Sequence, residues 1–247
     1  MRISSVPQQG PAIELPSAAK WLLVLIMAVT ANLFILSLSI DVFSMSRSYY
    51  DQEFEKLGTT ELTGLTAEEL GGVSDMIIGY LKGQEPEFQF EVERNGRQVQ
   101  LFNDREQTHM VDVLVLFQLN GRIKMIAIAA FALSAFVALQ LSRDRALLYR
   151  GLIGAGVLGI AAAGFLLLLI TIDFTKYFTL FHELFFDNDL WLLNPKTDLL
   201  IVILQEQFFV DIAIRIFGLY IGLNVVLVTI GTIFLRSSKR AGRFRRA

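Results

Sequence analysis

The sequence predicts an α-helical membrane protein with four transmembrane helices and a small extracytoplasmic α/β elaboration that includes a β-hairpin. Hydrophobic residues make up 53% of the chain, and the mean hydropathy is +0.51, as is typical of membrane proteins. Four apolar stretches reach the roughly 20 residues that a helix needs to cross a bilayer. Between the first two, a short segment alternates apolar and polar residues around an Asn-Gly pair.

The predicted spans define one membrane domain, residues 18–247, which follows a proline-containing lead, residues 1–17. The first span is longer than the roughly 7–15 apolar residues of a secretory signal, and no small-residue cleavage site follows it. We therefore expect a retained anchor. The predicted spans and the longer connections between them are residues 21–40, 123–141, 152–172 and 212–235, with loops 41–121 and 173–211.

Lysine and arginine predict the orientation of these spans, because short cytoplasmic segments carry an excess of both. Cations gather before the first span, between the second and third spans, and after the fourth span. We therefore expect both termini in the cytoplasm and both long loops outside it. The cations that carry this prediction are Arg2, Lys20, Arg143, Arg145, Arg150, Arg236, Lys239, Arg240, Arg243, Arg245 and Arg246.

The first long loop predicts two helices followed by a hairpin. Residues 46–57 continue the first helix to Gly58. Thr66 and Glu69 have the spacing of a capping box, which opens a helix that reaches Lys82. In the hairpin, Asn95-Gly96 favours a type I′ turn. That turn places Val92 opposite Val99 and Phe90 opposite Leu101, on one apolar face that rests on lipid or on a neighbouring helix.

The third span carries small residues at every fourth position: Gly151, Ala155, Gly159 and Ala163. Small residues at this spacing allow helix backbones to approach closely. We interpret the stripe as a helix-packing surface.

The chain has two histidines, and each falls in one of the long loops. Glu106, His109 and Asp112 are three residues apart, so on a helix they are neighbours. A carboxylate of Glu106 or Asp112 could then hold one ring nitrogen of His109 and leave the other free as a base. A surface histidine among solvated acids is the alternative.

His182 lies between phenylalanines and an acidic cluster, Asp187-Asn188-Asp189, with Trp191 just beyond. Its segment is too short for a further span and suggests a re-entrant or surface-lying hairpin. For His182 itself, structural or substrate-orienting roles stand beside direct catalysis. Arg215, near the outer end of the fourth span, could meet an anionic lipid head or an acidic loop residue.

Several chemistries are excluded or disfavoured. The chain has no cysteine, which excludes disulfides and a thiolate nucleophile. Zinc, iron or a bis-histidine haem is conceivable from two histidines with acids, but no metal-binding histidine spacing occurs. We expect neither metal nor cofactor. No phosphate-binding glycine loop is present, and nothing indicates a nucleic-acid partner.

The segments around both histidines resemble the lipoprotein intramolecular transacylase (Lit) family of bacterial four-span membrane proteins. The order and spacing of the matching residues, together with the membrane layout, cover most of the chain. The matching residues are Glu106-x-x-His109-Met110-x-Asp112-Val113 and, after His182, Asn188-Asp189-x-Trp191-x-Leu193-Asn194-Pro195-x-Thr197-Asp198-x-Leu200-Ile201.

The resemblance implies an acyltransferase in the bacterial cell membrane with its active site on the extracytoplasmic face. It would move the sn-2 acyl chain of a diacylglyceryl cysteine to the α-amine of that cysteine and leave a lyso-form lipoprotein. The expected partners are diacylglyceryl-modified lipoproteins and membrane lipid. A non-enzymatic accessory protein, which binds lipid or a membrane partner through its outer loops, is the alternative.

Within that expected reaction, His109 is the candidate general base, oriented by Asp112 or Glu106. His182 would position the amine or stabilise the developing oxyanion. The candidate substrate-binding residues are Asn188, Asp189, Trp191 and Arg215.

Overall fold

The computed structural model describes the backbone of residues 13–244 and the side chains of residues 13–238. Residues 1–12 of the predicted lead, and the tail side chains from Lys239 onward, therefore lie outside the described residues. The elements are α1 (Ser17–Ser44), α2 (Arg47–Lys56), α3 (Thr59–Thr63), α4 (Ala67–Leu81), β1 (Glu91–Arg94), β2 (Arg97–Gln100), α5 (Asp104–Phe136), a π-helical turn (Val137–Leu141), α6 (Arg145–Ile172), α7 (Phe174–Phe185), α8 (Leu200–Ile203) and α9 (Glu206–Phe244).

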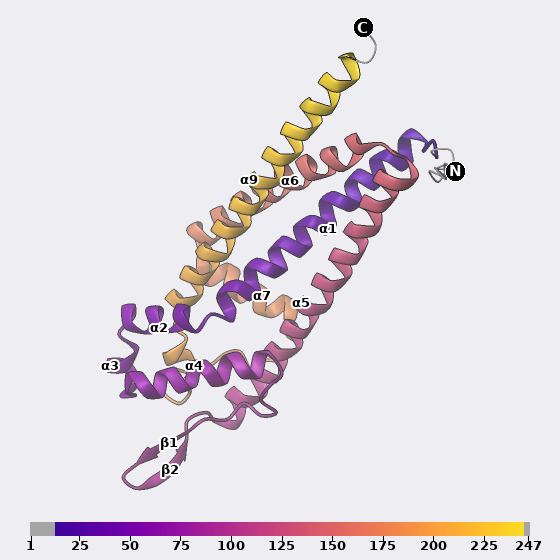
Figure 1. Cartoon of the computed structure of the whole chain (residues 1–247). Helices are drawn as coiled ribbons and strands as arrows, with labels where there is room; N and C mark the ends of the chain where they lie inside the picture. The colour runs from indigo at the N-terminus through magenta and orange to yellow at the C-terminus, as the bar shows by residue number, and fades with distance from the viewer. Residues whose placement is uncertain (1–12, 245–247) are drawn as a thin grey trace, which may run out of the picture.

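Four long helices form the bundle, which confirms the predicted number of spans. Helix α1 packs against α5, α6 and α9, and α6 also packs against α9. The start of α1 and the end of α9 lie at one end of the bundle (Figure 1). The opposite end carries α2 to α4 and the hairpin, and we call it the distal end. The helices long and apolar enough to cross a membrane are Ser17–Ser44, Asp104–Leu141, Arg145–Ile172 and Glu206–Ser238.

Each predicted span lies inside one of these helices, but α5 begins well before its predicted span. The Asn103 side chain accepts hydrogen bonds from the N–H groups of Arg105 and Glu106, which starts the helix at Asp104. The helix then runs without a break into the apolar residues from Ile123 onward. About five turns of α5 therefore precede its apolar segment.

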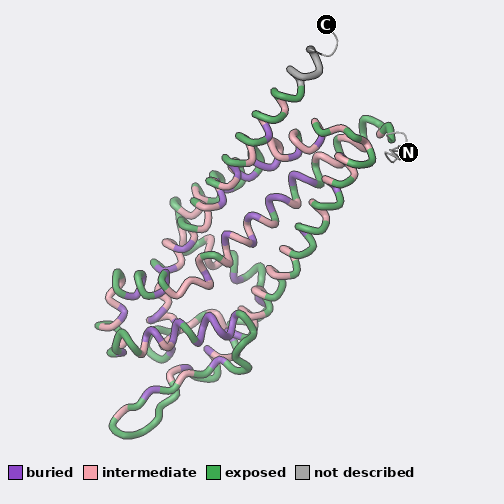
Figure 2. The backbone as a smooth tube through the Cα atoms, viewed as in Figure 1, coloured by how far each residue is buried: buried purple, intermediate pink, exposed green. Residues whose placement is uncertain are grey.

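The distal end has its own hydrophobic core, built from α2, α4, the hairpin, α8 and the first turns of α5 and α9. Phe208 of α9 lies at its centre, with ring centroids 5.2 Å from both Tyr49 and Tyr50 of α2. Most of α4 is buried there (Figure 2). This core fixes the start of α9 against α2.

Local signals for the small distal elements are confirmed with one change. The capping box of Thr66 and Glu69 opens α4. The helix predicted as a continuation of the first span is a separate helix, α2, because the chain leaves α1 at Ser44. The Ser46 side chain accepts a hydrogen bond from the Tyr49 N–H and so caps the new helix.

The hairpin has the predicted register, with Val92 opposite Val99. Asn95 and Gly96 both have positive φ, as a type I′ turn requires. The Leu101 N–H donates to the Phe90 carbonyl at 2.9 Å, which extends the pairing by one residue on each side. Val92 is buried, and the Phe90 ring lies against Gly72 of α4. The hairpin therefore rests on a helix.

The small-residue stripe of α6 is buried along its whole length. A Cβ on Gly151 would lie 3.0 Å from the Met27 Cβ of α1, and one on Gly159 would lie 2.3 Å from the Asn32 Oδ1. Ala155 and Ala163 are completely buried. The stripe is a helix-packing surface, as predicted.

Candidate active site

The two histidines, 73 positions apart in the chain, come together at the distal end. His109 lies in the second turn of α5, and His182 lies near the end of α7. Their ring centroids are 6.2 Å apart, and the planes are tilted by 34°. Both side chains are buried, each with 8% of its surface exposed. One small group placed between the rings could contact both.

Helix α7 fixes the ring of His182 through its own backbone. The Nδ1 atom lies 2.7 Å from the carbonyl oxygen of Phe178, one turn earlier. A carbonyl oxygen can only accept, so Nδ1 carries the hydrogen and donates it. In the neutral ring, Nε2 then has the lone pair, and it can accept a hydrogen bond or a proton.

Aromatic side chains surround the pair. Trp191 stacks on His182 at 4.9 Å between centroids, and Phe178 meets the same ring edge-on at 4.4 Å. Phe186 lies 5.4 Å from each histidine. Such walls exclude water, and a charged imidazolium loses hydration there that apolar rings do not replace.

Burial therefore lowers the pKa of His109 to about 4, with a smaller contribution from the nearby His182 and an opposing one from Asp112. His109 lies 14 residues before Ile123, where the apolar segment of α5 begins. Burial also lowers the pKa of His182, against the hydrogen bond to Phe178. Both rings are accordingly neutral near pH 7.

One ring nitrogen of His109 has no partner among the described residues. Its Nδ1 is buried and makes no hydrogen bond within the described part of the chain. Buried polar atoms almost always have a partner, and exceptions often mark functional sites. This atom is therefore placed to meet a group that the protein alone does not supply.

The carboxylates beside His109 bind other groups. Glu106 accepts the Asn103 N–H at 2.7 Å and the Leu200 N–H at 2.6 Å, and so joins the first turns of α5 and α8. Asp112 accepts the Asn188 side-chain amide at 2.9 Å. Neither hydrogen-bonds His109, contrary to our expectation from spacing. Free N–H groups at two helix starts are strong donors for a buried carboxylate, and they occupy Glu106.

The segment between α7 and α8, residues 186–199, is held on the first turns of α5. The Arg105 guanidinium lies 3.5 Å from an Asp189 carboxylate oxygen and donates to the Asp189 carbonyl. The Trp191 indole N–H donates to the Asn188 carbonyl at 2.9 Å. Three of the predicted substrate-binding residues, Asn188, Asp189 and Trp191, thus lie together beside the histidines.

Asp198 completes this attachment, and sequence reasoning assigned it no role, although it lies in the matching motif. It accepts the Asn194 N–H at 2.7 Å and the side-chain amide of Asn103 at 2.9 Å. These hydrogen bonds, that of Asn194 foremost, hold the pKa of Asp198 below its usual range. An aspartate directly before the apolar run Leu199–Leu204 was the signal available in the sequence.

Arg215 has a different setting. Its guanidinium lies 3.2 Å from Glu53 of α2 and 5.0 Å from the centre of the Tyr49 ring. Glu53 is completely buried. Arg215 thus meets an acidic residue of the first long loop, as one of the two predicted partners, and none of its described contacts is with a histidine.

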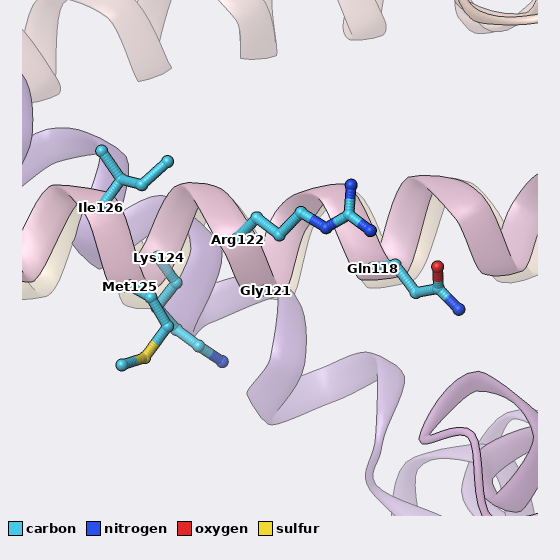
Figure 3. A pocket seen from close by; sticks show the side chains of 6 residues that line it. All are labelled: Gln118, Gly121, Arg122, Lys124, Met125 and Ile126. Atoms are coloured by element: carbon cyan, nitrogen blue, oxygen red, sulfur yellow. The ribbon is translucent and has the colours of Figure 1, made fainter.

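A hollow of about 710 Å³ runs along α5 from Gln118 to Ile126, beyond the histidines. Figure 3 shows that its lining side chains leave the helix in different directions, Arg122 on one side and Met125 on the other. They do not converge on one point.

Among the described residues, no group of three His, Cys, Asp or Glu side chains could hold a metal ion.

Four helices long and apolar enough to cross a membrane, with a buried pair of neutral histidines at one end, define a membrane-integral protein with a candidate acid–base site. The family model for lipoprotein intramolecular transacylase Lit matches residues 25–209. The chain therefore belongs to the Lit family and is an acyltransferase of the cell membrane.

Solved structures agree with this assignment at the level of the fold. The membrane-integral lipoprotein intramolecular transacylase Lit from Bacillus cereus is 24% identical, with a TM-score of 0.76 over 92% of this chain and 100% of that chain. Two variants of that protein, in which a histidine is replaced by arginine or by alanine, give TM-scores of 0.70 over 91% of this chain and over 95% and 96% of theirs. No curated protein sequence matches significantly.

Proposed function

We propose that the chain transfers the sn-2 acyl chain of a diacylglyceryl-modified lipoprotein to the α-amine of the same cysteine, with His109 as the proton carrier. The observation that carries this proposal is the buried Nδ1 of His109, which has no hydrogen-bond partner among the described residues and belongs to a ring that packs against Phe186. Intramolecular transfer needs no protein nucleophile, because ester and amine belong to one molecule and contact supplies a large rate advantage.

In the proposed reaction, His109 carries one proton from the attacking amine to the leaving glycerol oxygen. As the amine attacks the ester carbonyl, a C–N bond forms and the attacking nitrogen becomes strongly acidic. His109 takes a proton from that nitrogen. It then returns the proton to the glycerol oxygen as the ester C–O bond breaks, which leaves an amide and a free hydroxyl.

The low pKa of His109, about 4, suits the second proton transfer, from His109 to the glycerol oxygen. An imidazolium of that pKa gives up its proton readily to a leaving alkoxide. An α-ammonium group with an ordinary pKa near 8 holds its proton too strongly to lose it to such a base. The same apolar walls favour the neutral amine, so the site selects the form that can attack.

For His182 we propose that it positions the amine. Its Nδ1–H is engaged with Phe178, and the neutral ring offers only the Nε2 lone pair. That atom can accept a hydrogen bond from an amine N–H but cannot donate one to an oxyanion. Of the two roles expected from the sequence, the geometry supports the first.

The remaining residues support these two rings. We propose that Trp191 forms a wall of the substrate site and that Asn188 and Asp189 hold this wall in place through α5. Glu106 and Asp112 position the elements that carry the histidines. Arg215, paired with buried Glu53, is proposed to join α9 to α2.

The test is the mass of lipoprotein N-termini in a bacterial host that lacks this activity. Expression of the chain should convert diacyl to lyso-form lipoprotein. His109→Ala should reduce conversion about 10²–10⁴-fold, the usual cost of losing a positioned acid–base group. Thr108→Ala, an exposed neighbour on the same turn, is the control and should leave conversion unchanged.

Two results would count against the proposal. Parental conversion by well-folded His109→Ala protein would remove His109 from the chemistry. The absence of any lyso-form lipoprotein with the unaltered chain would favour the alternative, an accessory protein that binds lipid or a membrane partner. His182→Ala should impair conversion less severely, since water can replace a positioning hydrogen bond.

A further inference from the structure

A second polar site lies at the end of the bundle opposite the histidines, between the first turns of α1 and α6. A hollow of about 150 Å³ opens there, lined by Ser17, Lys20, Trp21, Val24, Leu147 and Arg150. The lining comes from two helices whose starts meet. Unlike the hollow along α5, this one therefore has side chains that converge from two sides.

The two cations of this hollow are weakly paired. Lys20 lies 4.0 Å from Asp144, at the limit of an ion pair, and Asp144 also accepts the Ala146 N–H as the cap of α6. Arg150 is exposed and forms no ion pair with any described side chain. The cationic rim is thus only partly neutralised, and a guanidinium with free donors remains beside it.

The polarity of the hollow changes with depth. Ser17, Lys20 and Arg150 form the rim, whereas the floor is Val24 and Leu147, of which Leu147 is 1% exposed. From Trp21, which is 69% exposed, the outer face of α1 continues through Leu25 and Val29, both exposed, at four-residue steps. A charged group at the rim would therefore have an apolar track directly below it.

We propose that this hollow binds an anionic glycerophospholipid, with the phosphate between Lys20 and Arg150 and an acyl chain along Leu25 and Val29. Arginine and phosphate form paired charge-assisted hydrogen bonds, and tryptophan favours the level of the lipid head groups. Basic residues near a membrane surface attract anionic lipid. The site is independent of the transacylation, since it lies at the other end of the bundle.

The measurement is lipid binding to the purified full-length chain by native mass spectrometry, with phosphatidylglycerol and phosphatidylcholine as probes. The parental chain should bind phosphatidylglycerol more tightly. Lys20→Gln with Arg150→Gln should weaken phosphatidylglycerol binding at least about tenfold and leave phosphatidylcholine binding unchanged. Lys82→Gln with Arg97→Gln removes the same charge from exposed positions at the distal end and should change neither.

A second variant keeps the test decisive if the double variant folds poorly. Ser17→Glu adds an anion at the rim, yet a carboxylate in the first turn stabilises a helix. It should weaken phosphatidylglycerol binding without loss of stability. Unchanged binding in both variants, or an equal loss in the distal control, overturns the proposal. Complete displacement of the lipid by millimolar inorganic phosphate would show a small-anion site and would overturn the lipid assignment.

Discussion

His109 depends on its surroundings for the property that matters most to the proposed reaction, a neutral ring at physiological pH. Burial among the aromatic walls, His182 and Arg105 all lower the pKa of His109 and so disfavour the imidazolium, and only Asp112 opposes them. In the unfolded chain the ring has its ordinary pKa near 6.5. As the pH falls from 6.5 toward 4, the unfolded chain therefore binds a proton that the folded chain does not, and stability decreases over that range.

This gives a direct prediction, because the chain contains only two histidines. With ¹⁵N-labelled histidine, the ring signals of His109 should titrate near pH 4 and those of His182 below 6.5. A His182→Gln sample assigns the two sets. A His109 titration midpoint at 6.5 would mean that the ring is hydrated and would contradict the proposed proton transfer.

Glu106 illustrates a residue whose position was predicted but whose partners were not. Replacing it by glutamine, Glu106→Gln, leaves one oxygen to accept one of its two backbone N–H donors. The other donor, from Asn103 or Leu200, loses its partner in a buried place, at a cost of about 1–3 kcal/mol.

Thermal unfolding should therefore show a lower Tm for Glu106→Gln, with conversion near the parental level at a temperature where the variant is folded. Glu87→Gln, at an exposed position, is the control. A hundredfold loss of activity at unchanged Tm would instead place Glu106 in the chemistry.

Among the elements, α1, α6 and α9 meet at a buried polar node. The Asn32 amide donates to the Ala155 carbonyl at 2.9 Å, and the Tyr220 hydroxyl donates to Asn32. Gly159 lies against both Asn32 and Asn224, and Asn224 is completely buried. The close approach of α6 depends on the missing side chain at this position.

Gly159→Ala should therefore destabilise the bundle by about 1–3 kcal/mol, the usual cost of overpacking. Gly154→Ala is the matched control on the same helix, because its new Cβ would meet Ala28 at an ordinary 3.8 Å. It should be neutral or slightly stabilising. Equal Tm values for the two variants in the same detergent would show that the node does not limit packing.

The hairpin offers a similar comparison across one pair of facing residues. Val92 is 5% exposed and Val99, its partner, is 43% exposed. Val92→Ser should lower the stability of the distal end by about 1–3 kcal/mol, whereas Val99→Ser should have a much smaller effect. Proteolysis at the distal end would report the difference, and an equal effect would mean that the hairpin does not rest on α4.

For the whole molecule, the orientation in the membrane is a prediction from the arginine distribution. The chain has no cysteine, so single cysteines can be introduced without interference. Asn95→Cys should react with an impermeant thiol reagent from outside the cell, and Arg240→Cys only from the cytoplasmic side. Three predicted spans separate the two positions. Labelling of both from the same side would therefore contradict the even total number of spans.

Features of the fold that depend on residues close together in the chain could be predicted from the sequence. The spans, the Thr66 capping box, the Asn95-Gly96 turn and the α6 stripe each follow from local spacing, and each is present. The meeting of His109 and His182 does not follow from spacing, because the two residues are 73 positions apart in the chain. The partners of Glu106 and Asp112 likewise come from distant backbone and side-chain groups that spacing cannot predict.

The attachment of residues 186–199 to α5 also sets when the protein can first become active during synthesis. His109 enters the membrane environment with the second span. Its partner ring arrives only after the third span, and the hydrogen bond from Leu200 to Glu106 comes later still. A ribosome-bound chain that ends before α7 therefore has only His109, and one that ends before α8 has both histidines but lacks the Leu200 N–H that binds Glu106. Competence is gained near the end of translation, when most of the membrane bundle has already formed.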